Sequence, residues 1–464
     1  MRPFPFLSTL FLLSLLVAGC VGMQPTDPYA PVPRHEAFPL LTARKPPAAV
    51  RPEVAGEPLT LERCLEVALA NNPELAATDW EVSAAGFRAD QARAALWPTL
   101  SAEGGYSRFL DPQRLVQARF NGEVGDFDEN IHRADLILKW PLYTGGRIVN
   151  EIAATELLGK AEENRLSRTR EELVFNVSST FYAILGQRKV IQSLEFSITA
   201  MEEHLKQVSE LLSAQKAARV DLLRTEVRLA DLRQSLVREQ NILAVQKRVL
   251  SSLLGLDYDT ERFVVEGKLS FEEISLDAGS LLRQAMEGRP DYHAARARLE
   301  AQARRVDVAR AGHLPTVSLV GSFGPRGDFS GDREEAGNIG FGVTVPIFEG
   351  GRVVARVEEE RAVLSAAQER LRKLELQIRQ DVETAVLEVR SSSERVKAVQ
   401  KAIEQARESL RIERQKYDLG MGSMTDVLDA QSALLQSETS YYRALADFRA
   451  ALARLDLATG GHLS

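Results

Sequence analysis

The sequence contains few of the groups that enzymes use for chemistry. Of its 464 residues only six are histidine and two are cysteine, and aromatic residues make up 6%. No two histidines have the HxH or helix-face spacing of a metal site, and no stretch matches G-x-S-x-G, H-E-x-x-H or a nucleotide-binding fingerprint. We therefore predict no catalytic residue, no metal and no cofactor, and expect a chain that is not an enzyme.

A charge of one sign and long hydrophobic runs are also lacking. The 58 Lys and Arg residues are interleaved with 65 Asp and Glu residues, and the net charge is -7, so no nucleic-acid partner is expected. Beyond the N-terminus, no stretch approaches the length of a transmembrane helix. If the chain crosses a membrane, it must do so with strands. Abundant Ala, Leu, Glu, Arg and Gln favour long helices over compact β-rich domains.

The N-terminus predicts a lipoprotein. Residues 1–19 contain an apolar stretch too short to span a bilayer and are interpreted as a signal peptide. The VAGC sequence that ends at Cys20 resembles the bacterial lipobox, in which that cysteine is acylated; the alternative is an ordinary signal peptide with an incidental cysteine. Val21 is not the aspartate of inner-membrane retention, which favours the outer membrane. Residues 20–58 are expected to form a lipid-tethered, Pro-rich linker, and Cys64, left without a partner, a small buried apolar residue.

The remaining chain is a duplication. Five short segments recur in the same order, the first two about 217 positions later and the last three about 205 positions later: NNPELAA as GRPDYHA, LWPTLSAEGGYS as HLPTVSLVGSFG, WPLYTGGR as VPIFEGGR, VDLLRTEV as TDVLDAQS, and LLG as ATG. One shorter loop in the second copy explains the change of offset, whereas chance matches would not share two offsets. We predict a first repeat at 59–255, an inter-repeat segment at 256–279 and a second repeat at 280–460.

Each copy contains stretches in which apolar and polar residues alternate, which predicts strands. The apolar positions share one face and correspond between copies: Ala134, Leu136, Leu138, Trp140 and Leu142, and Ile339, Phe341, Val343, Val345 and Ile347. The strands are expected to end at Pro141 and Pro346. A soluble antiparallel sandwich is one explanation. The other is a membrane barrel, for which four strands are too few, so the chain would have to pool its strands with copies of itself.

Paired glycines follow the later strand of each copy. Gly145 and Gly146 precede one predicted helix, and Gly350 and Gly351 precede the other. Glycine permits the backbone turn that converts a strand into a helix. The GxxxxGK[ST] spacing of a phosphate loop is absent from both places.

Two very long helical hairpins are predicted next. No proline occurs in residues 147–214 or 352–419, and either stretch as one helix would be roughly 100 Å long. Turns near Ala217 and at Gly420 reverse the chain into returning helices. There the apolar residues are spaced by sevens, which indicates a left-handed coiled-coil seam: Leu222, Leu229, Leu236, Leu243 and Leu250, and Val427, Leu434, Tyr441, Phe448 and Leu455.

Taken together, these segments resemble the TolC-like outer-membrane efflux family over nearly all of the mature chain. The closest matches are LTLERCLEVALANNPEL at Leu59, PLYTGGR at Pro141, PIFEGGR at Pro346 and YDLGMGSMTDVLDAQ at Tyr417. The resemblance implies a mainly α fold with a membrane β-barrel contribution: a homotrimer with a twelve-stranded β-barrel in outer-membrane lipid and a long periplasmic α-barrel. It also implies an equatorial belt that draws on the inter-repeat segment and the tail after Leu457.

The resemblance further assigns residues to the inner mouth of the pore. Asp426 and Asp429 match the acidic positions of that mouth, and they lie three residues apart, near one face of a helix. Under threefold symmetry each would form a ring of three carboxylates that favours cations. The structural alternative is that both are ordinary N-terminal helix charges that complement the dipole.

Other residues of the tips match family positions less completely. Asp221 corresponds to Asp426 in the first copy, and Tyr417 matches a tyrosine that helps to latch the closed state. The arginine of that latch is replaced here by Gly422, so that ion pair cannot form. Gly420 and Gly422 are expected at the adaptor-facing turn. Because Gln215 takes the place of Gly420 in the first copy, we expect that turn to use another backbone conformation.

The resemblance implies an exit duct for small molecules that works with a periplasmic adaptor and an inner-membrane pump. A duct for type I secretion of protein or peptide is one alternative, and a structural lipoprotein that braces the envelope without conducting is another. The strands have apolar residues on one face, which argues against the structural lipoprotein, because such a protein needs no lipid-facing barrel.

Overall fold

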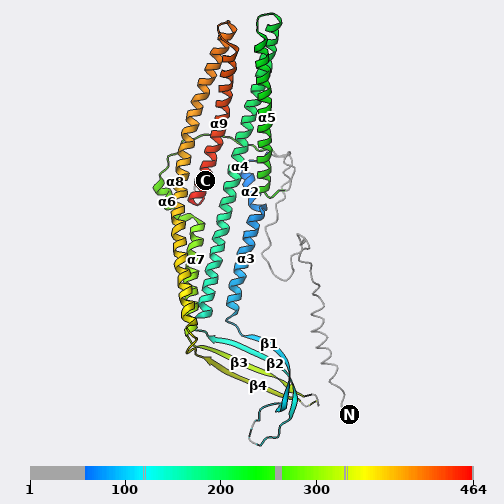
Figure 1. Cartoon of the computed structure of the whole chain (residues 1–464). Coiled ribbons are helices and arrows are strands. Elements are labelled where there is room, and N and C mark those ends of the chain that lie inside the picture. The colour runs from blue at the N-terminus through cyan, green and yellow to red at the C-terminus, as the bar shows by residue number, and fades with distance from the viewer. Residues whose placement is uncertain are drawn as a thin grey trace. The chain divides into compact units, whose positions relative to one another are not determined.

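The two repeats have the same order of elements (Figure 1). The structure is a computed structural model, and it describes residues 58–461 apart from 119, 121, 257–263, 329–330 and 332. The first repeat consists of α2 (Leu61–Asn71), α3 (Pro73–Ala94), β1 (Thr99–Arg114), β2 (Phe127–Tyr143), α4 (Arg147–Ser213) and α5 (Arg219–Leu253). The second consists of α6 (Ala278–Gly288), α7 (Pro290–Arg310), the 3-10 turn η1 (Ala311–His313), β3 (Thr316–Gly327), β4 (Arg333–Thr344), α8 (Arg352–Asp418) and α9 (Met424–Thr459). The predicted mainly helical fold with four strands in two repeats is confirmed.

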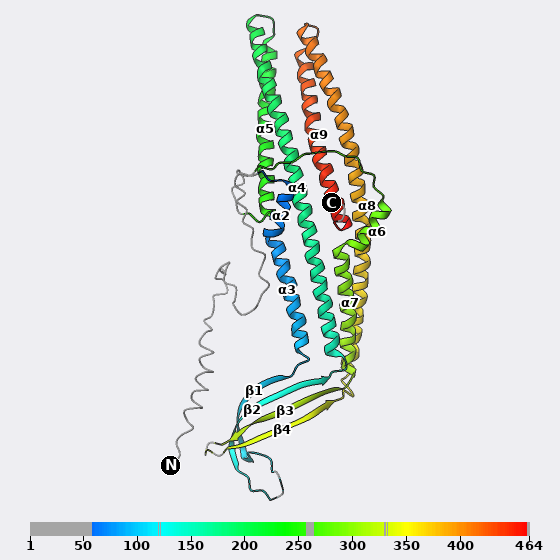
Figure 2. The same ribbon diagram turned by 180° about the vertical axis from the view of Figure 1, so that it is seen from behind.

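The long helices connect the sheet to two hairpin tips at the opposite end (Figures 1 and 2). α4 and α8 have 67 residues each, and no proline interrupts either of them. α3 and α7 lie along their sheet-proximal halves, and α5 and α9 along their tip-proximal halves. α4 packs against helices of both repeats, namely α3, α5, α7 and α9. Among the described residues, no helix combines the length and the apolar character needed to span a membrane.

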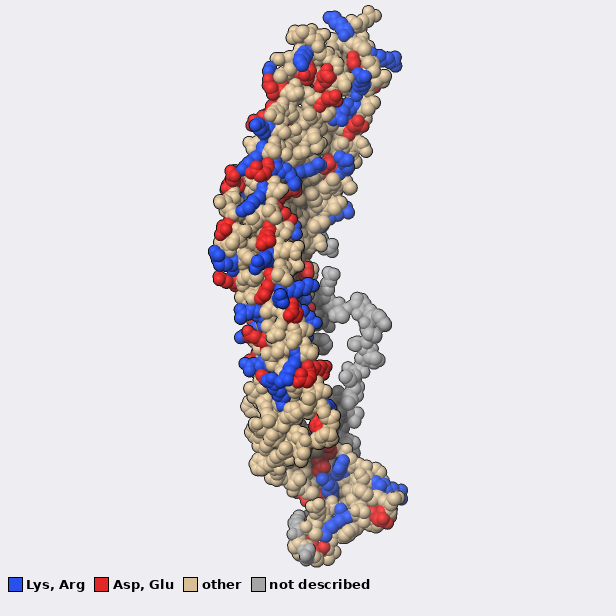
Figure 3. Space-filling view, turned by 60° about the vertical axis from the view of Figure 1, so that its left-hand side comes forward, with Lys and Arg blue, Asp and Glu red and all other residues tan. Residues whose placement is uncertain are grey.

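The four strands form one antiparallel sheet in the order β1-β2-β3-β4. Its register places Trp140 opposite Leu319, and Leu319 in turn opposite Phe341, so the predicted apolar positions that lie within the paired parts of β2 and β4 share one face. Val345 and Ile347 lie beyond the end of β4. Large apolar side chains on this face are exposed, among them Leu136, Phe323, Ile339 and Phe341. Figure 3 shows that the dense surface charges of the helices stop above a band with very little charge and that charges return at the far end of the sheet. The opposite face carries polar groups, including an ion pair between Asp135 and Arg326 at 2.5 Å.

The strand ends differ from the prediction. β2 continues through Pro141 to Tyr143, whereas β4 stops at Thr344, two residues before Pro346. Proline cannot donate to a ladder but is tolerated at edges and irregularities. β2 has passed the end of its pairing with β1 at Lys139, and its register with β3 shifts just after Pro141, so the missing N–H costs no ladder bond to β1.

The paired glycines that lead into α4 and α8 all have positive φ, between 62° and 84°. L-residues with a Cβ rarely adopt this conformation. The surroundings of the two turns differ, however. A Cβ added to Gly145 would lie 2.6 Å from Leu314 Cβ, whereas no atom lies within 4 Å of one added to Gly350 or Gly351.

Each repeat is closed by a contact between its start and its end. Asn72, at the break between α2 and α3, donates from Nδ2 to Leu253 O at 2.9 Å. The equivalent Arg289, between α6 and α7, reaches Ala458 O at 3.5 Å. The returning helices end in glycines with positive φ, and a Cβ on Gly460 would lie 2.9 Å from the Gly288 carbonyl carbon. These contacts explain why the terminal LLG and ATG segments recur with the break segments.

The apolar core lies along the helices in separate clusters. One cluster packs α2, α4 and α5 together and includes Cys64, Phe181 and Leu250; a second packs α6, α8 and α9 around Phe448 and Leu455. The predicted seam residues of α5 and α9 pack in these two clusters and in two further clusters nearer the tips, and Cys64 is fully buried, as predicted. Burial raises the pKa of the Cys64 thiol to about 12, so this thiol is neutral and unreactive.

Candidate functional site

The two hairpin tips have the same backbone turn, contrary to the expectation for the first copy. Gln215 is the one described non-glycine residue with positive φ, at 59°, and Gly420 has a φ of 73°. The hydrogen bonds correspond as well: Lys216 N donates to Leu211 O, and Met421 N donates to Lys416 O, both at 2.8 Å. The expectation failed because the tight reversal at the end of a helix requires a left-handed residue, and a flexible polar side chain can tolerate that strain when the flanking helices hold the turn.

The second-copy tip carries the predicted glycines and the first aspartate. A Cβ on Gly422 would lie 2.9 Å from Lys416 Cβ and 3.2 Å from Tyr417 N, so only glycine lets the chain pass so close to the end of α8. Ser423 then caps α9 and forms a capping box with Asp426, in which each side chain accepts a hydrogen bond from the other residue's backbone N–H at 3.3 Å. Asp426 therefore has a structural task in addition to any effect of its charge.

Both predicted pore aspartates are exposed at the start of α9. Asp429 lies one turn after Asp426 and borders a groove between α5 and α9 that is also lined by Arg224 and Arg228. These arginines connect the first repeat to the second. Arg224 Nη1 donates to Thr425 Oγ1 at 3.0 Å, and Arg228 Nη2 donates to Ser432 Oγ at 2.5 Å. Carboxylates and guanidinium groups thus lie close together at this end of the bundle.

Tyr417 joins the two hairpins from the last turn of α8. Its ring is partly buried against the cluster formed by α4, α5 and α9, and it lies edge-on to the ring of His204 on α4 at a centroid distance of 6.3 Å. Burial raises the pKa of Tyr417, and the carboxylates of Asp221 and Asp418 raise it further. Tyr417 is consequently a neutral donor, and Asp221 acts on it across the gap between the copies. The structure thus brings Tyr417, Asp221 and the capped turn to one end of the bundle.

One buried polar cluster was missed by the sequence reasoning. Glu239 on α5 keeps only 4% of its side chain exposed and accepts hydrogen bonds from Gln187 on α4 at 2.7 Å and Arg443 on α9 at 3.1 Å. Burial alone would raise the pKa of Glu239, but these two partners outweigh it and lower the pKa. A signal was present: Thr225, Leu232 and Glu239 are spaced by sevens on the buried stripe beside the leucine seam, and a glutamate there needs partners.

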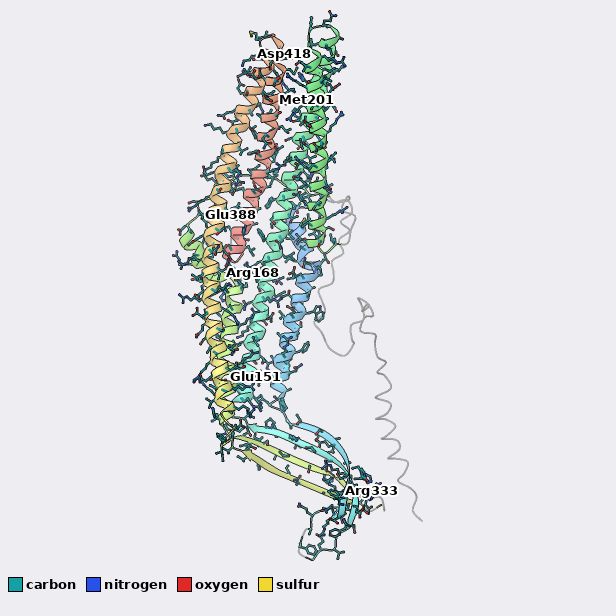
Figure 4. The ribbon with its side chains drawn as sticks, in the orientation of Figure 1. Glu151, Arg168, Met201, Arg333, Glu388 and Asp418 are labelled. Atoms are coloured by element: carbon teal, nitrogen blue, oxygen red, sulfur yellow. The ribbon has the colours of Figure 1, made fainter. Side chains whose placement is uncertain are left out.

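A second missed cluster lies in the sheet-proximal half of α4, where Figure 4 labels Arg168. Arg168 is paired with Glu171 at 3.2 Å and donates to Leu457 O at 3.0 Å. The neighbouring Arg289 is 2% exposed and is paired with Asp291 at 2.7 Å and Asp381 at 3.0 Å. Both arginines thus face the carboxyl end of α9, where positive charge complements the helix dipole.

Glu171 makes this second cluster sensitive to pH. Burial raises the pKa of Glu171 to about 7, although Arg168 opposes the shift. Because the folded pKa lies above the unfolded value, the protonated form favours folding, and stability is lost as the pH rises from about 4.5 through 7. We expect Glu171→Gln to remove this loss and to exceed the wild type in unfolding free energy at pH 8 by about 1–2 kcal/mol, measured by denaturant unfolding at several pH values.

The matched control is Glu172→Gln. Glu172 pairs with the same Arg168 at 3.0 Å but keeps 53% of its side chain exposed, against 18% for Glu171. Its substitution should leave the pH dependence of stability unchanged. Equal pH profiles for Glu171→Gln and the wild type would contradict the assignment.

Cys20, the predicted acylation site, lies outside the described residues. Within the described part of the chain, no three His, Cys, Asp or Glu side chains are grouped to hold a metal ion. The tip is a junction between two hairpins and presents the carboxylates of Asp426 and Asp429 to solvent.

The chain is similar to known proteins over most of its length. The family model described as "Outer membrane efflux protein" matches residues 64–256 and 281–461. Nodulation protein T of Rhizobium leguminosarum bv. trifolii is 23% identical over 96% of this chain and 95% of its own length. Outer membrane protein OprJ of Pseudomonas aeruginosa is 24% identical over 97% of this chain and 95% of its own length.

The fold is shared with solved structures as well. A crystal structure of a membrane protein from Pseudomonas aeruginosa superimposes with a TM-score of 0.76 at 23% identity, covering 86% of this chain and 93% of that one. Two family matches, one to each repeat, together span most of the chain. The chain therefore belongs to the outer membrane efflux protein family, the channel proteins of tripartite efflux pumps.

Proposed function

We propose that three copies of this chain assemble into the exit duct of an efflux system, which passes small molecules from a periplasmic adaptor and an inner-membrane pump across the outer membrane. The observation that carries the proposal is the one-sided sheet. Its apolar face presents Phe341 and Ile339, each more than 70% exposed, to the surroundings of the protomer. Burial of that face in lipid removes it from water, while the opposite polar face can line a lumen.

The sheet edges support the threefold assembly. Within the described residues, β1 and β4 each have one neighbouring strand, so each offers an open row of backbone N–H and C=O groups. Such edges are satisfied by pairing with another strand, and in lipid they must be. Pairing of β4 of one copy with β1 of the next would give a twelve-stranded closed sheet from three copies.

The helices and the inter-repeat segment complete the proposed duct. α4 and α8, joined by their returning helices, would form the wall of an α-barrel that extends into the periplasm. Residues 256–279 would contribute to an equatorial belt, and Leu59, which pairs with Val265 in a short parallel bridge, would hold that segment against the first repeat. The adaptor would meet the tips, where Gly420, Gly422 and Asp221 lie.

The pore assignment of Asp426 and Asp429 is tested by conductance. Trimers reconstituted in planar bilayers should be cation-selective, and Asp426→Asn with Asp429→Asn should lower the cation-to-anion permeability ratio by roughly threefold or more, because two rings of three carboxylates are neutralised. Asparagine keeps an acceptor oxygen for the capping box, so the turn should remain folded. The readout is the reversal potential in a salt gradient.

The control for this experiment is Asp447→Asn. Asp447 lies on the same helix with 61% of its side chain exposed and is paired with Arg395, far from the tip. It should leave selectivity unchanged. If the Asp426/Asp429 variant retained the wild-type permeability ratio, these two residues would be removed from the pore mouth, although the duct itself could still conduct.

The lipid anchor is a separate part of the proposal. Acylation at Cys20 would fix the N-terminus in the outer membrane, since each buried methylene adds about 0.8 kcal/mol of membrane affinity. Metabolic labelling with a fatty-acid analogue should mark the wild type and leave Cys20→Ser unlabelled. Label that persists in Cys20→Ser would mean that residues 1–19 were misinterpreted.

A further inference from the structure

A contact between a histidine and a methionine joins the two hairpins just below their tips. His204 Nε2 on α4 lies 2.9 Å from Met424 Sδ on α9, although the two residues are 220 positions apart in the sequence. Met424 is 2% exposed and His204 is partly buried. The contact therefore links the first copy to the second in an environment from which most water is excluded.

A second thioether lies one helical turn away. Met201 is fully buried and belongs to the same apolar cluster as Met424. It precedes His204 by three residues on α4, so the two side chains are neighbours on one helix face. Figure 4 labels Met201 on the upper part of α4, below the level of Asp418 at the tip. The ring of Tyr417 lies edge-on to that of His204 from the side of α8.

The chemical state of these groups suits a ligand set. A neutral imidazole has one ring nitrogen with a free lone pair, which makes histidine the commonest metal ligand. Thioether sulfur is a soft, neutral donor. No carboxylate is part of the contact, and hard cations such as Mg²⁺ or Ca²⁺ require oxygen ligands. Thioether with imidazole favours Cu(I) and its chemical analogue Ag(I).

We propose that His204, Met424 and Met201 form a binding site for a soft monovalent cation of the Cu(I) or Ag(I) class between α4 and α9. The bound ion would enter between the imidazole and the Met424 sulfur, part them from their 2.9 Å contact, and hold both together with the Met201 sulfur, so that it fastens the second-copy hairpin to the first. This site is independent of the exit-duct function, since it concerns what the protomer binds rather than what passes through it.

Silver is the appropriate probe because Ag(I) does not change its oxidation state during the measurement. The full chain and its variants would be equilibrated with silver nitrate at pH 7 in chloride-free buffer, and bound silver counted per chain. Met424→Leu and His204→Gln should each bind about one silver ion fewer than the wild type, and Met201→Leu should weaken binding at the same site by roughly tenfold. Silver should also raise the unfolding temperature of the wild type but not that of Met424→Leu.

The control is Met421→Leu, which removes a methionine of the same tip that is 73% exposed. It should bind as much silver as the wild type. Silver held by Cys64 or other groups is common to all the variants and cancels in the comparison. Leucine conserves the volume of methionine, so Met424→Leu should fold. In the event that His204→Gln does not fold, the result for Met424→Leu is sufficient to test the proposal. Equal silver binding by Met424→Leu and the wild type would overturn the proposal and leave only an N–H···S hydrogen bond.

Discussion

Arg289→Met should lower the free energy of unfolding of the chain by about 3 kcal/mol. Arg289 is 2% exposed, and its guanidinium is paired with Asp291 and Asp381. Methionine fills a similar volume but leaves both carboxylates without their partner in a partly buried environment. The value is at the lower end of the range for buried pairs, because the two aspartate side chains remain 25% and 33% exposed. The measurement is denaturant unfolding followed by the helical circular dichroism signal.

Arg411→Met is the matched control for Arg289→Met. Arg411 also binds a carboxylate through two nitrogens, that of Glu408 at 2.6 and 2.8 Å, but both side chains are more than half exposed. Surface pairs of this kind contribute at most about 1 kcal/mol. If both variants lost the same small amount of stability, the cluster around Arg289 would have no special part in closing the second repeat.

Gly324→Ala should disrupt the pairing of β2 with β3. A Cβ at Gly324 would lie 2.8 Å from both the Ala134 carbonyl carbon and Asp135 Cα. These are backbone atoms of the neighbouring strand, which cannot move aside as a flexible side chain can. We expect a cost of about 3 kcal/mol or more, with the sheet opening between β2 and β3. Limited digestion with trypsin should then cleave rapidly after Arg326, which the wild-type sheet protects.

Gly340→Ala provides the comparison for Gly324→Ala. Gly340 lies in β4 of the same sheet, and no atom lies within 4 Å of an added Cβ. Alanine there should leave trypsin resistance unchanged, and the lower backbone entropy of the unfolded chain should offset part of any cost. Equal protease resistance in the two alanine variants would show that β2 and β3 can separate slightly without loss of the sheet.

The parts of the fold that could be predicted are those written locally in the sequence. The absence of proline gave the extent of α4 and α8, and two-residue alternation gave the apolar face of the sheet. The strand ends were less predictable, because whether Pro141 ends β2 depends on where β1 stops alongside it. The prediction for the turn at Gln215 was wrong for a related reason. The helices on either side fix the backbone conformation of this turn, and residue type alone does not.

The parts of the candidate site that could not be predicted depend on residues far apart in the sequence. Gln187 and Glu239 are 52 positions apart, and His204 and Met424 are 220 apart. A heptad pattern shows that Glu239 falls on a buried stripe, but not that Gln187 and Arg443 will satisfy it. Likewise, the helix-start charge of Asp426 was recognised, whereas its reciprocal bond with Ser423 becomes visible only when the cap is formed.

The two strand-to-helix turns of a protomer should differ in how freely they can move. Gly145 packs tightly, because a Cβ added to it would lie 2.6 Å from Leu314 Cβ and 3.3 Å from Ala311 O. The space beside Gly350 and Gly351 is open, with no atom within 4 Å of an added Cβ. If the long helices tilt relative to the sheet, the backbone should therefore rotate at the turn of Gly350 and Gly351, while the turn at Gly145 stays fixed. A tilt of α8 would then change the backbone angles at the start of the helix without twisting β2. The tips could move apart while the sheet keeps its register.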